Sequence, residues 1–143
     1  MQRHPDWQAR LLSHIEAAMG RPFVWGQSDC CLFTADACAA VSGVDPAADY
    51  RGRYTTEIGA RRVLLKQHGS IAAVLDDHFD RIPVTMAQRG DAALFDGEAG
   101  DTAGIIWAGT LWAMTPQGAR PLPGIIPRIV WRVACPQPQS PSS

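Results

Sequence analysis

Apolar residues in the first half of the chain recur every three or four positions, which is the spacing of one face of an α-helix. The pattern predicts four helices, at residues 5–20, 30–42, 56–67 and 70–79. Glycine follows or ends three of these segments, as it commonly does at the end of a helix. The residues expected to face the core are Trp7, Leu11, Leu12, Ile15 and Met19 in the first helix, Ile58, Val63 and Leu64 in the third, and Ile71, Val74, Leu75 and Phe79 in the fourth.

After residue 82 the pattern changes to short apolar runs bounded by Gly, Pro and Asp, which is typical of strands. The predicted strands are residues 92–95, 103–108, 111–114 and 129–133. Gly109 and Thr110 separate the middle two and predict a tight hairpin. Helices followed by strands indicate an α+β domain, in which the N-terminal helices pack on a small antiparallel sheet formed by the C-terminal half.

The composition is that of an ordinary globular domain, with 46% hydrophobic and 19% charged residues in a chain of 143. We expect a single domain at residues 1–135 and a disordered tail at 136–143, because the tail is Pro, Gln and Ser with nothing to bury. The formal net charge is -1, so no strong basic field is present to hold nucleic acid. No apolar run is long enough to cross a bilayer, and the first residues lack the pattern of a signal peptide.

Four cysteines are too few for a disulfide scaffold in a chain of this size. Cys30 and Cys31 are adjacent, so a bridge between them would be strained. No Cys-x-x-Cys or Cys/His spacing matches a zinc site. We therefore expect free thiols, no metal and no cofactor.

The segment around Cys30 combines a glycine turn, two capping residues and the start of an apolar helix. Gly26 lets the backbone turn, and Ser28 or Asp29 can accept hydrogen bonds from the first free amides of the helix. Cys30 then lies in the first helical turn, where the partial positive charge favours a thiolate, although the Asp29 carboxylate opposes this. The alternative is that the three cysteines of this helix are small apolar core residues.

Aromatic residues provide two candidate contact surfaces. Trp107 and Trp112 flank the predicted hairpin, so either one of them faces outward as an anchor for a partner or both pack in the core. The second surface consists of Tyr50, Arg51, Arg53 and Tyr54, and the basic residues there also fit a solvated face.

Three segments resemble the motifs of NlpC-type cell-wall peptidases, which are small papain-like enzymes. VWGQSDCCLF at residues 24–33 is similar to the aromatic and glycine turn that precedes Asp-Cys-Ser-Gly at the start of a buried helix. RGDAALF at 89–95 resembles the Pro-Gly-Asp-Leu strand entry, and TAGIIWAG at 102–109 resembles the His-Val-Gly-Ile strand. The resemblance implies a papain-like α+β core, with the cysteine helix packed on an antiparallel sheet and Cys30 in the nucleophile position.

The sequence departs from that family where the proton acceptor should be. The catalytic histidine is replaced by Thr102, and the region of the third, orienting residue offers Ala113, Met114 and Thr115. A threonine hydroxyl cannot act as a base near neutral pH, whereas cysteine peptidases rely on a thiolate and imidazolium pair. The Ser-Gly that follows the family's cysteine is also replaced.

The four histidines of this chain do not substitute for the missing one by motif. All of them precede the predicted sheet. His4 and His14 are expected on the solvent side of the first helix, and His68 and His78 near the ends of later helices.

A second resemblance covers most of the chain. The WG..DC turn, the DP…RG.Y segment, the RGD-like strand entry and the final strand at 129–133 are similar to an uncharacterised group encoded among the tail genes of phages and prophages. This resemblance implies synthesis in the host cytoplasm, a later place in the virion tail, and other tail proteins as partners.

We expect a structural or assembly protein of a phage tail, without peptidase activity because Thr102 replaces the histidine. The alternative is an active cysteine peptidase or amidase that cleaves peptides of bacterial peptidoglycan, with Cys30 as nucleophile and its base from another histidine or a partner chain. A redox role for Cys30 and Cys31 is disfavoured, because vicinal cysteines lack the spacing of known dithiol sites.

Overall fold

The computed structural model describes residues 2–136, and this part of the chain divides into a helical first half and a stranded second half. The helices are α1 (Trp7–Met19), α2 (Cys30–Ser42), α3 (Glu57–Gln67), α4 (Ile71–Asp76) and the short 3-10 helix η1 (Val84–Met86). The strands are β1 (Asp80–Ile82), β2 (Ala92–Gly97), β3 (Gly100–Trp107), β4 (Thr110–Thr115), β5 (Gly118–Pro121) and β6 (Ile129–Arg132).

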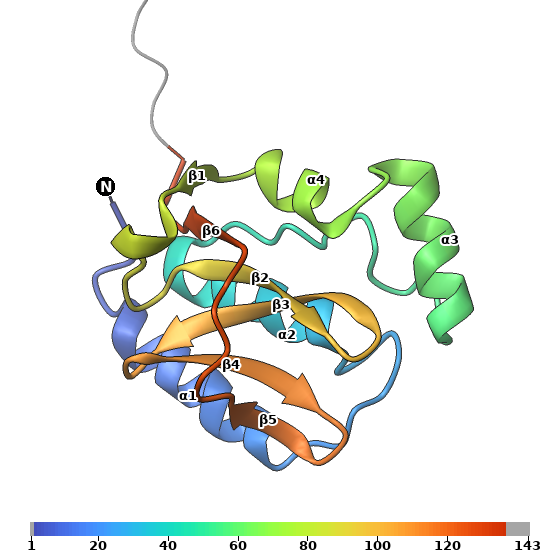
Figure 1. The fold of residues 1–143 in the computed structure, drawn as a ribbon, viewed down its shortest axis with the longest axis horizontal. Coiled ribbons are helices and arrows are strands. Elements are labelled where there is room, and N and C mark those ends of the chain that lie inside the picture. Colours follow the sequence, from blue (N-terminus) through green and yellow to red (C-terminus); the bar gives the residue numbers. More distant parts are fainter. Residues whose placement is uncertain (1, 137–143) are drawn as a thin grey trace, which may run out of the picture.

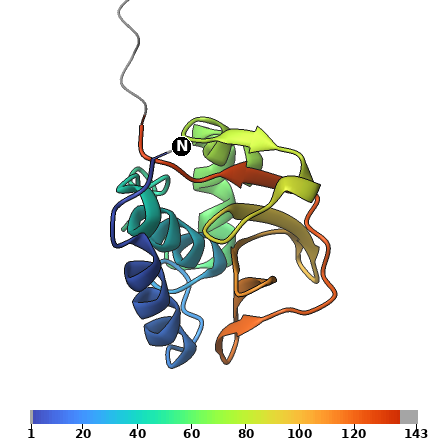
Figure 2. The same cartoon turned by 90° about the vertical axis from the view of Figure 1, so that its left-hand side faces the viewer.

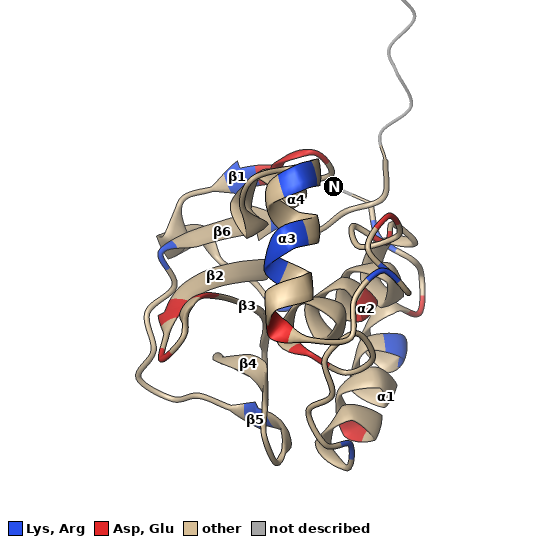
Figure 3. Cartoon of the chain, turned by 90° about the vertical axis from the view of Figure 1, so that its right-hand side faces the viewer, with Lys and Arg blue, Asp and Glu red and all other residues tan. Residues whose placement is uncertain are grey.

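The strands form one six-stranded sheet in the order β1-β6-β2-β3-β4-β5, and each neighbouring pair is antiparallel. Helices α1 and α2 lie together on one side of this sheet (Figures 1 and 3). The α+β prediction is therefore confirmed, with N-terminal helices packed on an antiparallel sheet from the C-terminal half.

The sheet has apolar side chains on both faces, because alternate residues of a strand point to opposite sides. Leu94 of β2 and Trp131 of β6 join the core that the sheet shares with α1 and α2. Their neighbours Phe95 and Val130 belong to a separate cluster on the other face. The connection from β5 to β6, residues 122–128, runs along the outside of the sheet (Figure 2) and adds Leu122 to that second cluster. This double burial explains why β2 reads as a continuous apolar run.

Helix α1 buries Leu11 and Ile15 as predicted, but the rest of its buried stripe is shifted. Leu11, Ile15 and Ala18 are buried. Leu12 and Met19, which were expected in the core, are 41% and 39% exposed. The buried stripe is displaced because α1 packs on α2 as well as on the sheet.

His14 contradicts the prediction that it faces solvent. Its Nε2 atom lies 2.9 Å from the carbonyl oxygen of Phe33, and its ring stacks on the Phe33 ring at 5.0 Å. The displaced stripe of α1 brings this histidine into the contact with α2, where burial lowers its pKa despite the hydrogen bond to Phe33.

Helix α3 stands away from the sheet at the right of Figure 1, and none of its residues is buried. Val63 and Leu64 face the protein as predicted, where they pack on a side cluster that includes Leu32 and Tyr50. Ile58 was also expected to face the core, but it is 66% exposed. The start and end of this helix agree with the prediction, but fewer of its apolar residues face the protein than were predicted.

The hairpin between β3 and β4 turns one residue earlier than predicted. Ala108 and Gly109 both have positive φ, 53° and 78°, as a two-residue type I′ turn requires. Trp107 pairs with Thr110, which is already part of β4. Trp107 and Trp112 both pack against the main core, so neither is the outward anchor that one alternative proposed.

The remaining differences lie at the edges. Helix α4 ends at Asp76, although Phe79 beyond it is buried as expected. The two edge strands β1 and β5, of three and four residues, were not predicted. Among residues 2–136, no helix has both the length and the apolar character that a membrane crossing requires. Apart from Pro136, the predicted disordered tail lies outside the described residues.

Candidate functional site

Asp29 organises the turn in front of the cysteine helix. It is the N-cap of α2, and its Oδ1 atom accepts a hydrogen bond from the Leu32 amide at 2.9 Å. Its Oδ2 atom accepts from the Gly26 amide at 2.9 Å and from the Tyr54 hydroxyl at 2.7 Å. This buried carboxylate thus joins the turn, the start of α2 and the connection that leads to α3. Ser28, the other candidate cap, instead donates to the carbonyl of Pro22.

Gly26 is required where the turn meets that connection. Its φ is +83°, and a Cβ atom there would lie 2.2 Å from the carbonyl oxygen of Tyr54. A larger residue would need both a strained backbone and a displaced Tyr54. The glycine therefore allows Tyr54 to reach Asp29.

Cys30 is the first residue of α2, as the capping pattern predicted, and its side chain is partly exposed. A hydrogen bond from the Cys31 thiol lowers the pKa of Cys30, and a further bond from the Ala103 backbone acts in the same direction, against burial and the Asp29 carboxylate. The helix start also favours the thiolate. Cys30, Thr102 and Ala103 all line the same cavity, so the thiol and the start of β3 share one wall of it.

The other cysteines of α2 are less available. Cys38 is fully buried, and burial raises its pKa. The hydrogen bond to Cys30 and burial raise the pKa of the Cys31 thiol. The core alternative therefore describes Cys38, whereas Cys30 and Cys31 both line an open space.

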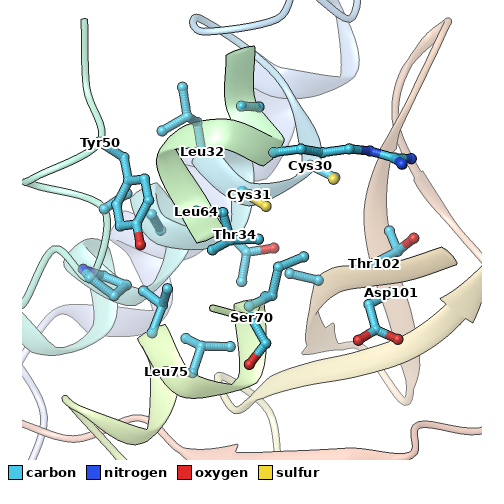
Figure 4. A pocket seen from close by; sticks show the side chains of 18 of the residues that line it. Cys30, Cys31, Leu32, Thr34, Tyr50, Leu64, Ser70, Leu75, Asp101 and Thr102 are labelled. Atoms are coloured by element: carbon cyan, nitrogen blue, oxygen red, sulfur yellow. The ribbon is translucent and has the colours of Figure 1, made fainter. Parts of the chain in front are cut away.

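That space is a cavity of about 360 Å³ between α2, the 46–54 connection, α3, α4 and the start of β3. Cys30, Asp101 and Thr102 lie on one side of it (Figure 4). Apolar side chains of the helices form most of the remaining wall. A volume of this size is at the lower end of the range for small-molecule sites.

No histidine is among the residues that line this cavity within 2–136. His68 Nδ1 lies 2.5 Å from the Tyr50 hydroxyl, and its Nε2 lies 2.6 Å from Asp77. His14 contacts Phe33 in the α1–α2 interface. The Thr102 hydroxyl donates to the carbonyl of Gly100 at 3.0 Å. The side chain beside the thiol is therefore an alcohol with its own partner, and it is not a base.

The region of the expected third residue offers no orienting group. Ala113 and Met114 are buried in the two cores, one on each face of the sheet. The Thr115 hydroxyl donates to the Gly118 carbonyl at 2.7 Å. Within the described chain, no three His, Cys, Asp or Glu side chains converge to hold a metal ion.

The predicted Arg/Tyr surface does not exist as one surface. Tyr50 and Tyr54 are buried in the side cluster. Arg51 forms ion pairs with Asp36 and Asp45, and Arg53 is exposed. The tyrosines point inward because the connection folds over α2, which the residue pattern of the connection does not reveal.

One polar residue of the cavity was missed. Thr34 lies in the middle of an apolar helix, and its side-chain oxygen is buried without a hydrogen-bond partner. The signal in the sequence was a single hydroxyl residue within the mostly apolar segment of residues 30–41.

The fold and this site define an α+β domain that holds a partly exposed thiol at a helix start beside an apolar cavity. The model of a domain of unknown function, DUF6950, matches residues 2–133, and the chain belongs to this family. No curated protein matches the sequence.

Proposed function

We propose that this chain is a structural or assembly protein of a phage or prophage tail, built on a papain-like, NlpC-type domain that lacks peptidase activity. The observation that carries the proposal is that Cys30 and Thr102 line one cavity, and that no imidazole of residues 2–136 lines it. In the resemblance to the peptidase family, Cys30 has the position of the nucleophile and Thr102 that of the histidine.

The arrangement of α2 and β3 supports the papain-like assignment. Cys30 opens a largely buried helix that packs on the antiparallel sheet. Cys30 lines the same cavity as Ala103, which is one residue after the position that corresponds to the family's histidine. The three motifs of the resemblance thus meet at one place in the fold, since RGDAALF forms β2 beside β3.

The missing base is the reason to propose no peptidase activity. Attack by a thiol on a peptide carbonyl needs a group that takes the thiol proton and returns it to the leaving amine. The Thr102 hydroxyl cannot do this near neutral pH. Loss of a member of such a catalytic unit typically costs several orders of magnitude in rate.

The tail setting is supported by the resemblance to the tail-gene group and by exposed apolar side chains. Ile125 and Ile126 in the β5–β6 connection are 41% and 81% exposed, and Leu65 on α3 is 70% exposed. Contiguous exposed apolar groups mark contacts for other proteins, and we propose the adjacent Ile125 and Ile126 as such a contact. Other tail proteins are the proposed partners, with peptidoglycan as a further possible contact of the tail tip.

Two measurements test the proposal. Purified peptidoglycan incubated with the unmodified chain should release no more peptide fragments than with Cys30→Ala. In phage particles that carry the gene, the chain should be found with the tail, and Ile126→Glu should reduce its incorporation without changing its unfolding midpoint. Cys30-dependent fragment release, or absence from every tail assembly intermediate, would contradict the proposal.

The lowered pKa of the Cys30 thiol favours one second candidate, an active cysteine peptidase or amidase of the cell wall. In that case the imidazole must come from a partner chain, because none of residues 2–136 supplies one to the cavity. Adding the other tail proteins to the peptidoglycan assay would then produce fragments with the unmodified chain and none with Cys30→Ala.

A further inference from the structure

The Thr34 hydroxyl is an unusual feature of the cavity. Thr34 is 1% exposed, and its Oγ1 atom has no hydrogen-bond partner among the described residues. A threonine inside a helix normally donates to the carbonyl four residues earlier. Here the side chain belongs to the cavity wall (Figure 4), where its oxygen atom is almost completely buried. A buried hydroxyl without a partner destabilises the free protein, so its presence at a cavity wall points to a group that completes it.

The wall around Thr34 is apolar. Leu32 lies on α2, Leu64 on α3, and Ile71, Val74 and Leu75 on α4, and all of them line the cavity. None of the residues of α3 is buried, and its Ala60 and Leu64 line the cavity together with the residues of α2. An apolar space of this size strongly favours apolar ligands over water.

Among residues 2–136, the charged side chains that line the cavity are those of Glu57, Arg61 and Asp101. Arg61 donates a hydrogen bond to Glu57 at 3.0 Å, and these two side chains are 62% and 45% exposed. Asp101 is exposed on the side of Cys30. A ligand that carried its charge to Thr34 would lose its hydration without gaining an ion partner. The interior therefore selects against charged groups.

We propose that this cavity binds a small, uncharged and mostly apolar molecule, whose hydroxyl or carbonyl group forms a hydrogen bond with Thr34 Oγ1. The inference goes beyond the proposed function, because it depends on Thr34 and the apolar wall and not on the phage setting. The cavity thereby becomes a ligand site next to Cys30 that needs no peptidase chemistry.

The test uses three probes that share one ring: benzyl alcohol, toluene and benzoate. Amide chemical shifts of the full chain are followed by NMR during titration at pH 8. Benzyl alcohol and toluene should bind saturably and shift amides of α2, α3 and α4. Benzoate should bind at least tenfold more weakly than benzyl alcohol.

Thr34→Val keeps the shape of the side chain and removes its hydroxyl. This substitution should weaken benzyl alcohol about two- to tenfold, the range expected for one hydrogen bond, and change toluene by less than twofold. It should also raise the melting temperature of the free protein, because the unpartnered hydroxyl is gone. Equal effects on the two neutral probes would overturn the role of Thr34.

A blocking variant tests the location. Ala60→Phe places a ring in the cavity from α3 and should abolish binding of both neutral probes. Leu65→Phe adds a ring of the same kind to the exposed side of α3 and should leave binding unchanged. If Ala60→Phe does not fold, the Thr34→Val comparison still decides. Absence of saturable binding by the folded, unmodified chain would overturn the proposal, while its incorporation into particles, measured separately, would not change.

Discussion

Tyr54 donates a hydrogen bond to the buried Asp29 carboxylate at 2.7 Å, from 25 positions further along the chain. This contact ties the connection before α3 to the N-cap of α2, and so ties one wall of the cavity to the turn that holds Cys30. Burial and the bond to Asp29 raise the pKa of Tyr54, so its hydroxyl stays a donor at neutral pH.

Tyr54→Phe should lower the free energy of unfolding by about 1.5–3 kcal/mol, the range for a hydrogen bond to a charged group. The loss arises because Asp29 keeps its burial and loses one of three donors. Urea denaturation at pH 7 measures the change. Arg53→Gln, an exposed neighbour, serves as control and should stay within about 0.5 kcal/mol. A Tyr54→Phe effect no larger than the control would show that the contact contributes little.

Cys30 should be the first cysteine of α2 to react with iodoacetamide at neutral pH, well before Cys38. The reason is its partial exposure and the pKa that Cys31 lowers.

Cys31→Ala should move the pH dependence of Cys30 labelling to higher pH, because the donor to the thiolate is lost. Thr102→His should move it to lower pH by placing an imidazole beside the sulfur. Mass spectrometry of labelled peptides from pH 6 to 10 reads both effects, with Cys38→Ala as control. An unchanged profile in Cys31→Ala would exclude the proposed hydrogen bond.

His14 should make the protein less stable in mild acid. Burial lowers the pKa of His14 in the folded state, so the unfolded chain binds a proton more readily. The stabilisation is present above the unfolded pKa of about 6.5 and is lost as the pH falls toward the folded pKa, by at most about 1.4 kcal/mol per pH unit. Urea midpoints at pH 5 and pH 7.5 should differ less in His14→Gln than in the unmodified chain. His78→Gln, at an exposed position, should keep the full difference.

Asp91 should be among the most sensitive charged positions. Its side chain is 0% exposed, and its Oδ1 atom lies 2.8 Å from Arg3 Nη2 and 3.1 Å from Arg132 Nε. Its Oδ2 atom accepts a hydrogen bond from the Gln88 amide. Asp91→Ala should cost about 3–5 kcal/mol, because two arginines then lose their buried partner.

Exposed ion pairs provide the control for Asp91. Arg128 bonds to Asp96 and Asp101 near the surface, with 46% of its side chain exposed. Arg128→Ala should therefore cost no more than about 1 kcal/mol. The two variants are compared in one guanidinium series, and similar losses would show that burial of Asp91 is not the deciding factor.

The sequence alone determined the features that depend on neighbouring residues. The spacing of apolar positions predicted the extents of α1, α2 and α3, and the Asp-Cys junction predicted a capped helix start at Cys30. The order of helices and strands predicted the α+β class. Local propensity, capping and turn chemistry carry this information along the chain itself.

Only the tertiary structure decided which side chains meet. His14 lies on Phe33 and Thr34 faces a cavity because α1, α3 and α4 pack around α2 in directions that apolar spacing does not specify. The short edge strands β1 and β5 form because a longer neighbour pairs with each of them. Contacts between distant segments depend on how whole helices and strands are placed relative to one another. The periodic pattern within one helix or strand does not specify that placement.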